Sequence, residues 1–208
     1  SRSNSRPLPM GSTIGILGGG QLGRMLALAA ARLGMKAHIY CPDPQSPAFD
    51  VTPRSTIAAY EDEAALARFA ETVDVVTYEF ENVPLRTAEM LAQLLPLRPG
   101  ANALGIAQDR LAEKAFLSIN RIPVAPFAAI PSLDQLKTEL REIGTPAVLK
   151  TTRLGYDGKG QRIIKSSRTA AAAFEALAPK PLVLEAFVPF TREISVVVAR
   201  GTDGAVAA

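Results

Sequence analysis

Two lysines and three glycines lie within one short segment of the chain, in an order that suits phosphate binding. An apolar run from residue 147 ends at Lys150, and a loop follows with glycines at positions 155, 158 and 160 and a second lysine, Lys159. Glycines let backbone N–H groups approach an anion, and lysines supply positive charge to phosphate oxygens. The segment is predicted to be a phosphate-covering lid. A basic β-hairpin turn is the alternative, since Asp-Gly is a strong hairpin signal.

A second glycine-rich segment, residues 18–23, fits the pattern G-x-G-x-x-G between a β-prone run and a helical one. Such a turn directs the N–H groups of a helix N-terminus at an anion. A dinucleotide site would also need an acidic residue at the end of the second strand, where it binds the ribose. That strand ends at Tyr40, and Asp43 comes only after a proline. Phosphate binding is therefore favoured over NAD binding, and a purely structural turn stays open.

Acidic residues follow the fourth predicted strand. Glu79 and Glu81 lie at its carboxyl end, which faces the ligand crevice in open α/β sheets. Taken alone, a solvated acidic loop is the simpler interpretation. His38, the only histidine, lies within a predicted strand and is interpreted as structural. The sequence has no His and Cys cluster for a metal and no serine or cysteine nucleophile motif.

Two further groups of charged residues come later in the chain. Arg110 and Lys114 lie one helical turn apart, a spacing that is usual for a solvated face. Glu185 and Glu193 flank an apolar linker, residues 186–189. Such a linker could hold an adenine ring while a carboxylate accepts ribose hydroxyls, although strand packing explains its apolar side chains equally well.

The elements that must position these residues alternate between strand and helix in the first half of the chain. Strands are predicted at 13–17, 37–40, 55–58 and 73–77, and helices at 21–33, 62–71 and 109–119. This alternation implies a parallel sheet with covered faces, hence a doubly wound α/β domain. Helix 21–33 is predicted to use one apolar face, formed by Leu22, Met25, Leu26, Ala29 and Leu33.

Pro123 and Pro126 mark a boundary before a second, smaller unit. Its predicted strands are 127–130, 147–150, 161–165 and 182–187, and its predicted helices are 133–143 and 170–177. A further strand at 193–200 precedes a turn at 201–204 and has no partner, so we expect the chain to end inside a third structural unit. Residues 1–11 are interpreted as a disordered leader.

Composition excludes several classes of protein. The 208 residues carry a formal net charge of +3 with scattered basic residues, which argues against nucleic-acid binding. The sequence lacks the roughly 18 consecutive apolar residues of a membrane span. A single cysteine, Cys41, excludes an intramolecular disulfide and fits a reducing cytoplasm.

Six segments, taken in order, resemble one family. They are residues 18–26, 78–83, 108–110, 149–150, 155–161 and 185–188. The chain resembles 5-(carboxyamino)imidazole ribonucleotide synthase, the ATPase subunit of phosphoribosylaminoimidazole carboxylase and an ATP-grasp enzyme of purine biosynthesis. The lid and the segment Tyr-Glu-Phe-Glu-Asn-Val at 78–83 discriminate it, because the related formyltransferase has a serine-rich lid.

The resemblance implies a carbon–nitrogen ligase that joins bicarbonate to 5-aminoimidazole ribonucleotide, with ATP cleaved to ADP and phosphate through carboxyphosphate. It implies Mg²⁺ ligands beyond the end of this chain, which as given should be inactive. It also implies a cytoplasmic homodimer that hands its product to a mutase. The alternatives are another ATP-grasp ligase or formyltransferase of purine biosynthesis, an NAD-linked oxidoreductase, and a non-catalytic nucleotide-binding or assembly module.

The resemblance also implies site residues and domains. The phosphates are assigned to Arg110 and Lys150, the lid to 155–161, adenine to 185–188 and the nucleotide ribose to Glu193. The full ATP set is Arg110, Lys150, Gly155, Tyr156, Asp157, Gly158, Lys159, Gly160, Gln161, Glu185, Ala186, Phe187, Val188 and Glu193.

Within the lid, Tyr156, Asp157 and Lys159 are the expected catalytic residues near the imidazole. The expected substrate-binding residues are Gly20, Gln21, Leu22, Glu79 and Glu81, with Gln21 facing the 5′-phosphate. Which of the two glutamates points inward stays undecided. The expected domains are a doubly wound pre-ATP-grasp domain (12–120), an ATP-grasp lid subdomain (121–182) and the incomplete start of a C-terminal subdomain (183–208).

Overall fold

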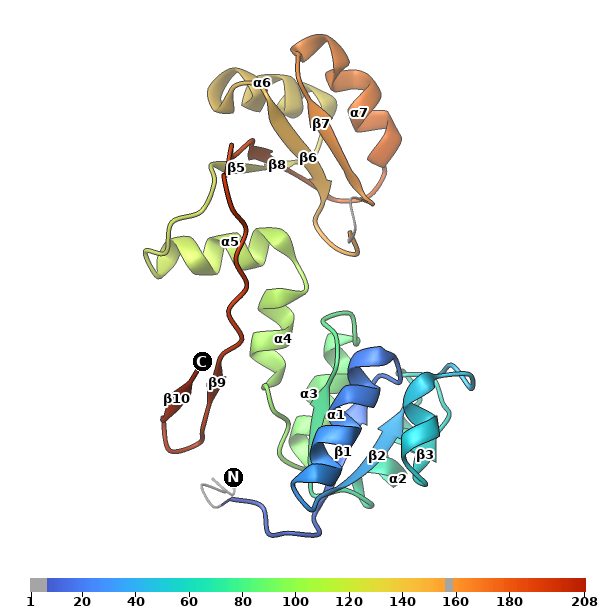
Figure 1. The fold of residues 1–208 in the computed structure, drawn as a ribbon. Helices are drawn as coiled ribbons and strands as arrows, with labels where there is room; N and C mark the ends of the chain where they lie inside the picture. Colours follow the sequence, from blue (N-terminus) through green and yellow to red (C-terminus); the bar gives the residue numbers. More distant parts are fainter. Residues whose placement is uncertain (1–6, 156–158) are drawn as a thin grey trace. The chain divides into compact units, whose positions relative to one another are not determined.

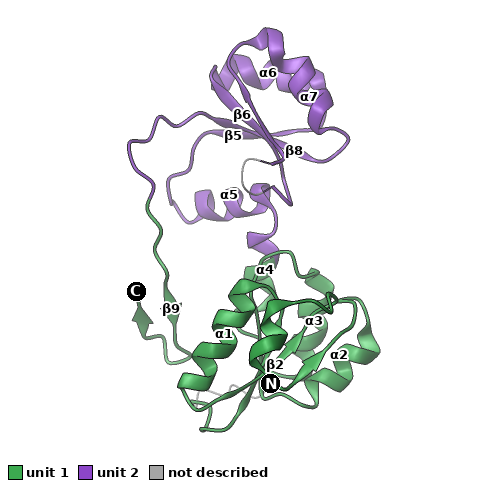
Figure 2. Ribbon diagram, turned by 45° about the vertical axis from the view of Figure 1, so that its right-hand side comes forward, with its two compact units in different colours: residues 1–104, 194–208 green, residues 105–193 purple. Residues whose placement is uncertain are grey.

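The chain folds into two compact units in the computed structural model, which describes residues 7–155 and 159–208 (Figure 1). Unit 1 comprises residues 1–104 and 194–208, and unit 2 comprises residues 105–193 (Figure 2). In the described part of the chain, none of the helices combines the length and the hydropathy that a bilayer crossing requires.

Unit 1 is built on a four-stranded sheet in which all strand pairs are parallel. In sheet order its strands are β3 (Ser55–Thr56), β2 (Lys36–Tyr40), β1 (Thr13–Leu17) and β4 (Val75–Tyr78). Its helices are α1 (Gln21–Arg32), the 3-10 helix η1 (Pro47–Val51), α2 (Glu63–Ala70), α3 (Leu85–Leu94) and α4 (Ala101–Ala107), which crosses the division between the units.

Both faces of this sheet are covered. Ile16 and Ile39 pack with residues of α1 and η1 on one face, while Leu17, Tyr40 and Val76 pack with residues of α2 and α3 on the other. The predicted doubly wound α/β architecture is therefore confirmed. Helices α3 and α4 were absent from the prediction; α3 follows Pro84 and has no side-chain cap at its N-terminus.

The apolar face that the sequence predicts for α1 is wrong. Its buried residues are Gly23, Ala27 and Ala30, whereas Leu22 is 55% exposed and Leu33 is 70% exposed. The reason is the close approach of the helix to the preceding turn, because a Cβ added at Gly23 would lie 2.5 Å from the Gly18 carbonyl oxygen. Small residues therefore face the sheet and the large apolar ones face outward.

Unit 2 contains a four-stranded antiparallel sheet. In sheet order its strands are β5 (Phe127–Ile130), β8 (Leu182–Ala186), β6 (Ala147–Thr151) and β7 (Gln161–Ile164). Its helices are α5 (Arg110–Ile119), α6 (Leu133–Ile143), the 3-10 helix η2 (Ser167–Thr169) and α7 (Ala170–Leu177). Figure 1 shows α6 and α7 together on one face of the sheet.

The two faces of the second sheet differ in character. Leu149 and Leu184 point into the core formed with α6 and α7. Since side chains alternate along a strand, Lys150 on β6 and Glu185 on β8 lie on the opposite face. The unit therefore has one apolar face under its helices and one face that carries charged residues.

Three features of the structure differ from the expected domain limits. The division between units precedes α5, whereas the sequence placed the boundary after residue 120. Strand β8 lies between β5 and β6 in the sheet of unit 2 rather than opening a new subdomain. Gly11, in the expected leader, donates its N–H to the Gly34 carbonyl (2.8 Å), while residues 1–6 lie outside the described residues.

The strand predicted at residues 193–200 is also wrong over most of its length. Only β9 (Ala199–Arg200) is a strand, and it pairs antiparallel with β10 (Val206–Ala207) across the expected turn. Ile194 and Val197 are exposed. A β-prone sequence forms a strand only where a neighbour takes its backbone hydrogen bonds, so propensity alone overestimated this one.

Candidate functional site

The glycine turn of unit 1 holds an anion that the chain itself supplies. Glu79 follows β4, and the turn follows β1, its parallel neighbour in the sheet. The Glu79 carboxylate accepts the N–H of Gly20 (2.7 Å) and of Gly23 (2.5 Å). Gly20 is the N-cap residue of α1, so this carboxylate caps the N-terminus of the helix.

The glycines of this turn make room for Glu79. A Cβ added at Gly18 or Gly20 would collide with its side chain, and Gly18 also has a φ of +106°. Glu79 therefore points inward, whereas Glu81 is exposed and accepts a 3.4 Å hydrogen bond from the Asn82 side chain. Two of the N–H groups expected for phosphate are already bound to a carboxylate.

The glycine loop of unit 2 is a hairpin between β6 and β7. Lys150 pairs with Gln161 in the antiparallel register, and Thr151 donates its N–H to the Gly160 carbonyl (2.9 Å). The hairpin interpretation is therefore confirmed, and the lid interpretation stays a prediction. Lys159 and Gly160 form its returning side, and Gly160 has a φ of +70°. Tyr156, Asp157 and Gly158 lie outside the described residues.

Arg110, at the start of α5, binds the outgoing side of this hairpin. Its guanidinium donates to the carbonyls of Thr151 (3.0 Å) and Gly155, and its backbone N–H donates to the Thr152 carbonyl (2.9 Å). A residue expected to contact phosphate thus anchors the loop in this structure. Its neighbour Asp109 caps α5 by accepting the N–H of Leu111 (2.9 Å).

Asp109 contributes to the same anchoring. Its carboxylate forms an ion pair with Arg153 (3.5 Å) in the outgoing side of the hairpin. Neither this pair nor the carbonyl contacts of Arg110 were foreseen. The order Gln-Asp-Arg at 108–110 marks a helix start, but it does not indicate which loop the helix start contacts.

A charged cluster lies on the polar face of the second sheet. Glu185 Oε2 contacts Lys150 Nζ at 3.0 Å and Lys114 Nζ at 3.3 Å. The exposed fractions of the three side chains are 10%, 25% and 15% in that order. Lys114 also lies 5.7 Å from the centre of the Phe127 ring. The prediction that Lys114 belongs to a solvated face is wrong.

The linker after β8 is only partly available to a ligand. Ala186 donates its N–H to the Pro126 carbonyl (2.9 Å), and Phe187 donates its N–H to the Pro146 carbonyl (3.3 Å). The side chains of Phe187 and Val188 are exposed. Glu193 is exposed and lies in the extended segment that precedes β9. Unit 2 therefore brings Arg110, Lys150, Gly155, Gly160, Gln161 and Glu185 together through direct contacts, and Glu193 stays apart.

Two comparisons of sequence place the chain among known proteins. Residues 11–108 match the ribonucleotide synthetase preATP-grasp domain family, and residues 115–208 match the ATP-grasp domain family. A relative in Brucella melitensis, named N5-carboxyaminoimidazole ribonucleotide synthase, is 48% identical over 202 residues, which are 96% of this chain and 56% of that protein. The chain thus matches a preATP-grasp domain followed by an ATP-grasp domain, and it is similar to N5-carboxyaminoimidazole ribonucleotide synthases.

Solved structures of this family agree with the fold. The N5-carboxyaminoimidazole synthetase of Staphylococcus aureus, complexed with ADP, matches with a TM-score of 0.94 and 33% identity over 99% of this chain and 55% of that one. The Aspergillus clavatus enzyme, in complex with ADP and 5-aminoimidazole ribonucleotide, matches with a TM-score of 0.79 and 28% identity over 88% of this chain and 48% of that one. The chain spans about half the length of the curated relatives it matches.

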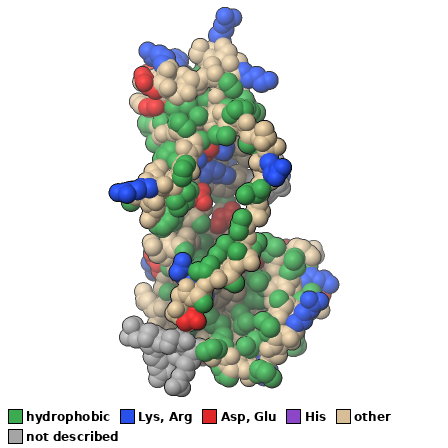
Figure 3. Space-filling model, turned by 60° about the vertical axis from the view of Figure 1, so that its left-hand side comes forward, with side chains coloured by type: hydrophobic (Ala, Val, Ile, Leu, Met, Phe, Trp, Pro, Cys, Tyr) green, Lys and Arg blue, Asp and Glu red, His purple; other side chains and the backbone are tan. Residues whose placement is uncertain are grey.

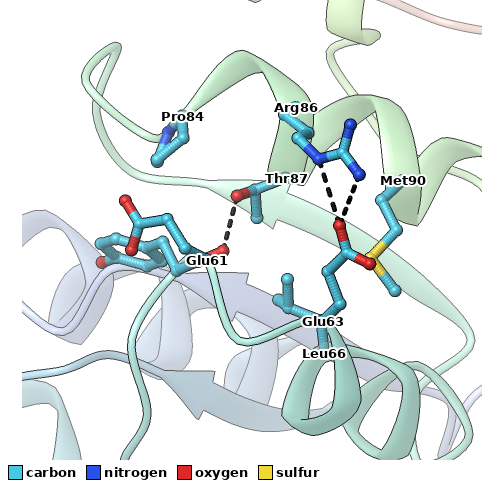
Figure 4. Close-up of a pocket in the computed structure, with 8 residues that line it drawn as sticks. Glu61, Glu63, Leu66, Pro84, Arg86, Thr87 and Met90 are labelled. Atoms are coloured by element: carbon cyan, nitrogen blue, oxygen red, sulfur yellow. Dashed lines mark hydrogen bonds and ion pairs between the residues drawn. The ribbon is translucent and has the colours of Figure 1, made fainter.

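A pocket between α2 and α3 in unit 1 is too small for a nucleotide such as the ADP of the solved relatives. It has a volume of about 80 Å³, against roughly 300–1,000 Å³ for ligand sites. Figure 4 shows the Arg86–Glu63 ion pair (2.7 Å) and the Thr87 hydroxyl, which donates to the Tyr60 carbonyl (2.6 Å). Its lining residues are Tyr60, Glu61, Glu63, Leu66, Pro84, Arg86, Thr87 and Met90. The pocket joins α2 to α3 and is not our candidate site.

Among the residues that the structure describes, other charged groups give no competing site. Figure 3 shows Lys and Arg side chains at separate places on one face of the molecule rather than in a stripe. Within residues 7–155 and 159–208, no group of three or more His, Cys, Asp and Glu residues could hold a metal ion. His38 is buried between the hydroxyls of Thr56 (2.8 Å) and Thr72 (2.9 Å), in a structural position.

Proposed function

We propose that these 208 residues belong to an ATP-dependent ligase that carboxylates 5-aminoimidazole ribonucleotide with bicarbonate, giving ADP, phosphate and 5-(carboxyamino)imidazole ribonucleotide. The observation that carries the proposal is the charged face of unit 2. There Lys150 lies opposite Gln161 at the base of a glycine hairpin, and Arg110 donates to a carbonyl of that hairpin, in a chain similar to this family. The relative from Brucella melitensis is almost twice as long as this chain. The experiments therefore use a protein of that length that contains this chain, which is called the full-length protein below.

The described residues fit a triphosphate. Lys150 and Lys114 together carry two positive charges against the single carboxylate of Glu185, so the cluster keeps one net positive charge in a half-buried place. In the proposed reaction Lys150 and Arg110 bind phosphate oxygens, and the hairpin covers them. Backbone groups of residues 185–188 are proposed to bind the ring edge of adenine. The N–H groups of Ala186 and Phe187 do not take part, because they already donate to carbonyls of the chain.

In the proposed chemistry a bicarbonate oxygen attacks the γ-phosphorus of ATP, forming carboxyphosphate and releasing ADP. The substrate's amino nitrogen then attacks the carboxyl carbon, phosphate leaves, and the nitrogen loses a proton. Carboxyphosphate hydrolyses in water, so the hairpin must exclude water before it forms. Tyr156, Asp157 and Lys159 are proposed to lie near the imidazole in that closed state.

Mg²⁺ would neutralise charge on the transferring phosphate. We propose that its carboxylate ligands come from the part of the full-length protein outside these residues. Glu193 is proposed to accept hydroxyls of the nucleotide ribose once its extended segment gains a partner.

The turn of unit 1 is proposed to bind the imidazole ribonucleotide. Gly20, Gln21 and Leu22 open α1, where the N–H groups of Gly20 and Gly23 are held by Glu79. With a carboxylate already at the centre of the turn, a dinucleotide pyrophosphate would meet like charge, which disfavours the NAD-linked alternative. The ribonucleotide's 5′-phosphate is proposed to lie beside Gln21, outside the carboxylate.

The deciding experiment measures ADP release by the full-length protein. ADP should form with ATP, bicarbonate and 5-aminoimidazole ribonucleotide together, and omission of the ribonucleotide should reduce it strongly. ADP formation that ignores the ribonucleotide would overturn the ligase assignment. Formate-dependent release would instead support the formyltransferase alternative.

We further propose a cytoplasmic homodimer whose product passes to a mutase. An association surface is supported by exposed apolar side chains on and at the end of α1, namely Leu22, Met25, Leu26 and Leu33. The cytoplasmic location is supported by Cys41, which is buried and forms no disulfide. Sedimentation of the full-length protein tests the dimer, and a monomer at micromolar concentration would contradict it.

A further inference from the structure

Two lysines from different elements bind the same oxygen atom in unit 2. Glu185 Oε2 lies 3.0 Å from Lys150 Nζ on β6 and 3.3 Å from Lys114 Nζ on α5. Glu185 faces Val148 in the sheet register, and Lys150 lies two residues along the same strand face. The Lys150–Glu185 contact is therefore a diagonal cross-strand pair, which long side chains can make and break without moving the backbone.

Lys114 is more enclosed than Lys150. Its side chain is 15% exposed, against 25% for Lys150. Its ammonium also lies 5.7 Å from the centre of the Phe127 ring on β5, close enough for a cation–π contact. The helix that carries it is fixed to the hairpin by Arg110, one turn earlier. Lys114 is thus a confined cation, whereas Lys150 lies beside the glycine hairpin.

The number of charges decides what each lysine can do. Glu185 is almost fully buried, and a buried carboxylate that loses its only partner is strongly destabilised. If Lys150 were the sole counter-ion, its transfer to a phosphate would leave Glu185 unpaired. With Lys114 in place, Glu185 keeps a counter-ion, and Lys150 is released at little cost.

We propose that Lys114 is a positioning residue: it retains Glu185 while Lys150 turns to the nucleotide phosphates. This inference rests on the proposed ATP site, and it assigns Lys114 no contact with ATP. Because Lys114 acts through Lys150, loss of Lys114 should weaken the binding of ligands that carry a phosphate chain and leave the binding of the nucleoside unchanged.

The test compares ATP, ADP and adenosine on the full-length protein by titration calorimetry. Lys114→Met should weaken ATP and ADP binding roughly tenfold or more, as for loss of a charge-assisted phosphate contact, and leave adenosine binding unchanged. Lys114→Arg should restore most of the affinity. Lys137→Met is the matched control, because Lys137 lies on α6 with an exposed ion pair to Asp134.

A double variant separates this role from simple packing. In the Lys114→Met background, Glu185→Gln removes the carboxylate that would hold Lys150, so ATP affinity should recover. Lys114→Gln replaces Lys114→Met in every arm if the methionine variant does not fold.

Three outcomes count against the inference in distinguishable ways. If the wild type binds ATP and Lys114→Met binds it as tightly, the inference is wrong while the proposed function stands. If Lys114→Met weakens adenosine by the same factor as ATP, Lys114 has only a packing role. If the wild type binds no ATP, the proposed function fails and this inference fails with it.

Discussion

Glu79 accepts the backbone N–H of Gly20 at 2.7 Å, across the gap between two parallel strands. The carboxylate thereby takes the place at the start of α1 that phosphate occupies in many glycine-rich turns. The N–H groups of Gly20 and Gly23 thus have an acceptor within the chain and need no ligand. The same contact gives a direct test of what holds the turn together.

Glu79→Ala should lower the free energy of unfolding by about 1–2 kcal/mol, because a charge-assisted helix cap is lost. Urea unfolding measures this change. Glu81→Ala is the matched control, since Glu81 is exposed, and it should change stability by less than about 0.5 kcal/mol. Equal effects for both variants would show that the N–H contacts of Glu79 add nothing to stability.

Arg110→Ala should loosen the hairpin between β6 and β7. It removes guanidinium contacts to the Thr151 and Gly155 carbonyls, with an expected cost of about 1–3 kcal/mol. Faster hydrogen exchange of the Thr151 N–H, which donates to Gly160, is the local measure. Arg162→Ala serves as control, because its exposed guanidinium donates to the carbonyl of the adjacent Gln161. Unchanged exchange in Arg110→Ala would argue against the anchor.

Lys150→Ala in the full-length protein should reduce kcat/KM for ATP by about 2–4 kcal/mol in transition-state terms, as expected for one lost phosphate contact. Folding should survive, because Lys114 still pairs with Glu185. ADP release gives the rate, and Lys165→Ala, an exposed lysine just after β7, is the control. Normal turnover in Lys150→Ala would remove this lysine from the site.

His38 should make stability depend on pH. Burial, and to a smaller degree the charge of Arg54, lower the pKa of its imidazole below the ordinary value of 6.5. The unfolded chain therefore binds a proton at higher pH than the folded one, so stability falls as pH decreases below about 6.5. Urea unfolding at pH 7.5 and pH 5.5 should show a larger loss for the wild type than for His38→Gln. Parallel losses would mean that other groups set the dependence.

Local patterns in the sequence predicted the bounds of several individual helices and strands. Strand β5 and helices α6 and α7 have the predicted bounds, because their apolar spacing, caps and flanking residues agree. Residues 193–200 show the limit of this reasoning, since their β-prone side chains lack neighbours for a strand. The face of α1 shows another limit. Helical spacing locates a stripe of large apolar residues, yet the stripe that packs is the small one at Gly23, Ala27 and Ala30.

The candidate site was predictable in its residue types and not in its pairings. Glycines, lysines and glutamates in a fixed order identified Lys150 and Glu185, but their mutual contact depends on strand register. Lys114 was misjudged because its surroundings, Phe127 and Glu185, come from strands distant in sequence. Arg110 has the expected position, but the carbonyls that it binds could not be inferred from composition.

The contact of Gly23 with the Gly18 carbonyl fixes the depth at which α1 rests on its sheet. The N–H of Gly23 is also one of the two that hold Glu79, so one residue sets both the steric fit and the electrostatics of the turn. A larger side chain at Gly23 would lift the helix and withdraw that N–H at once. Changes on the outer side of α1, such as at Leu22, meet no such limit. The packing of this helix on its sheet therefore restricts substitutions on its inner side alone.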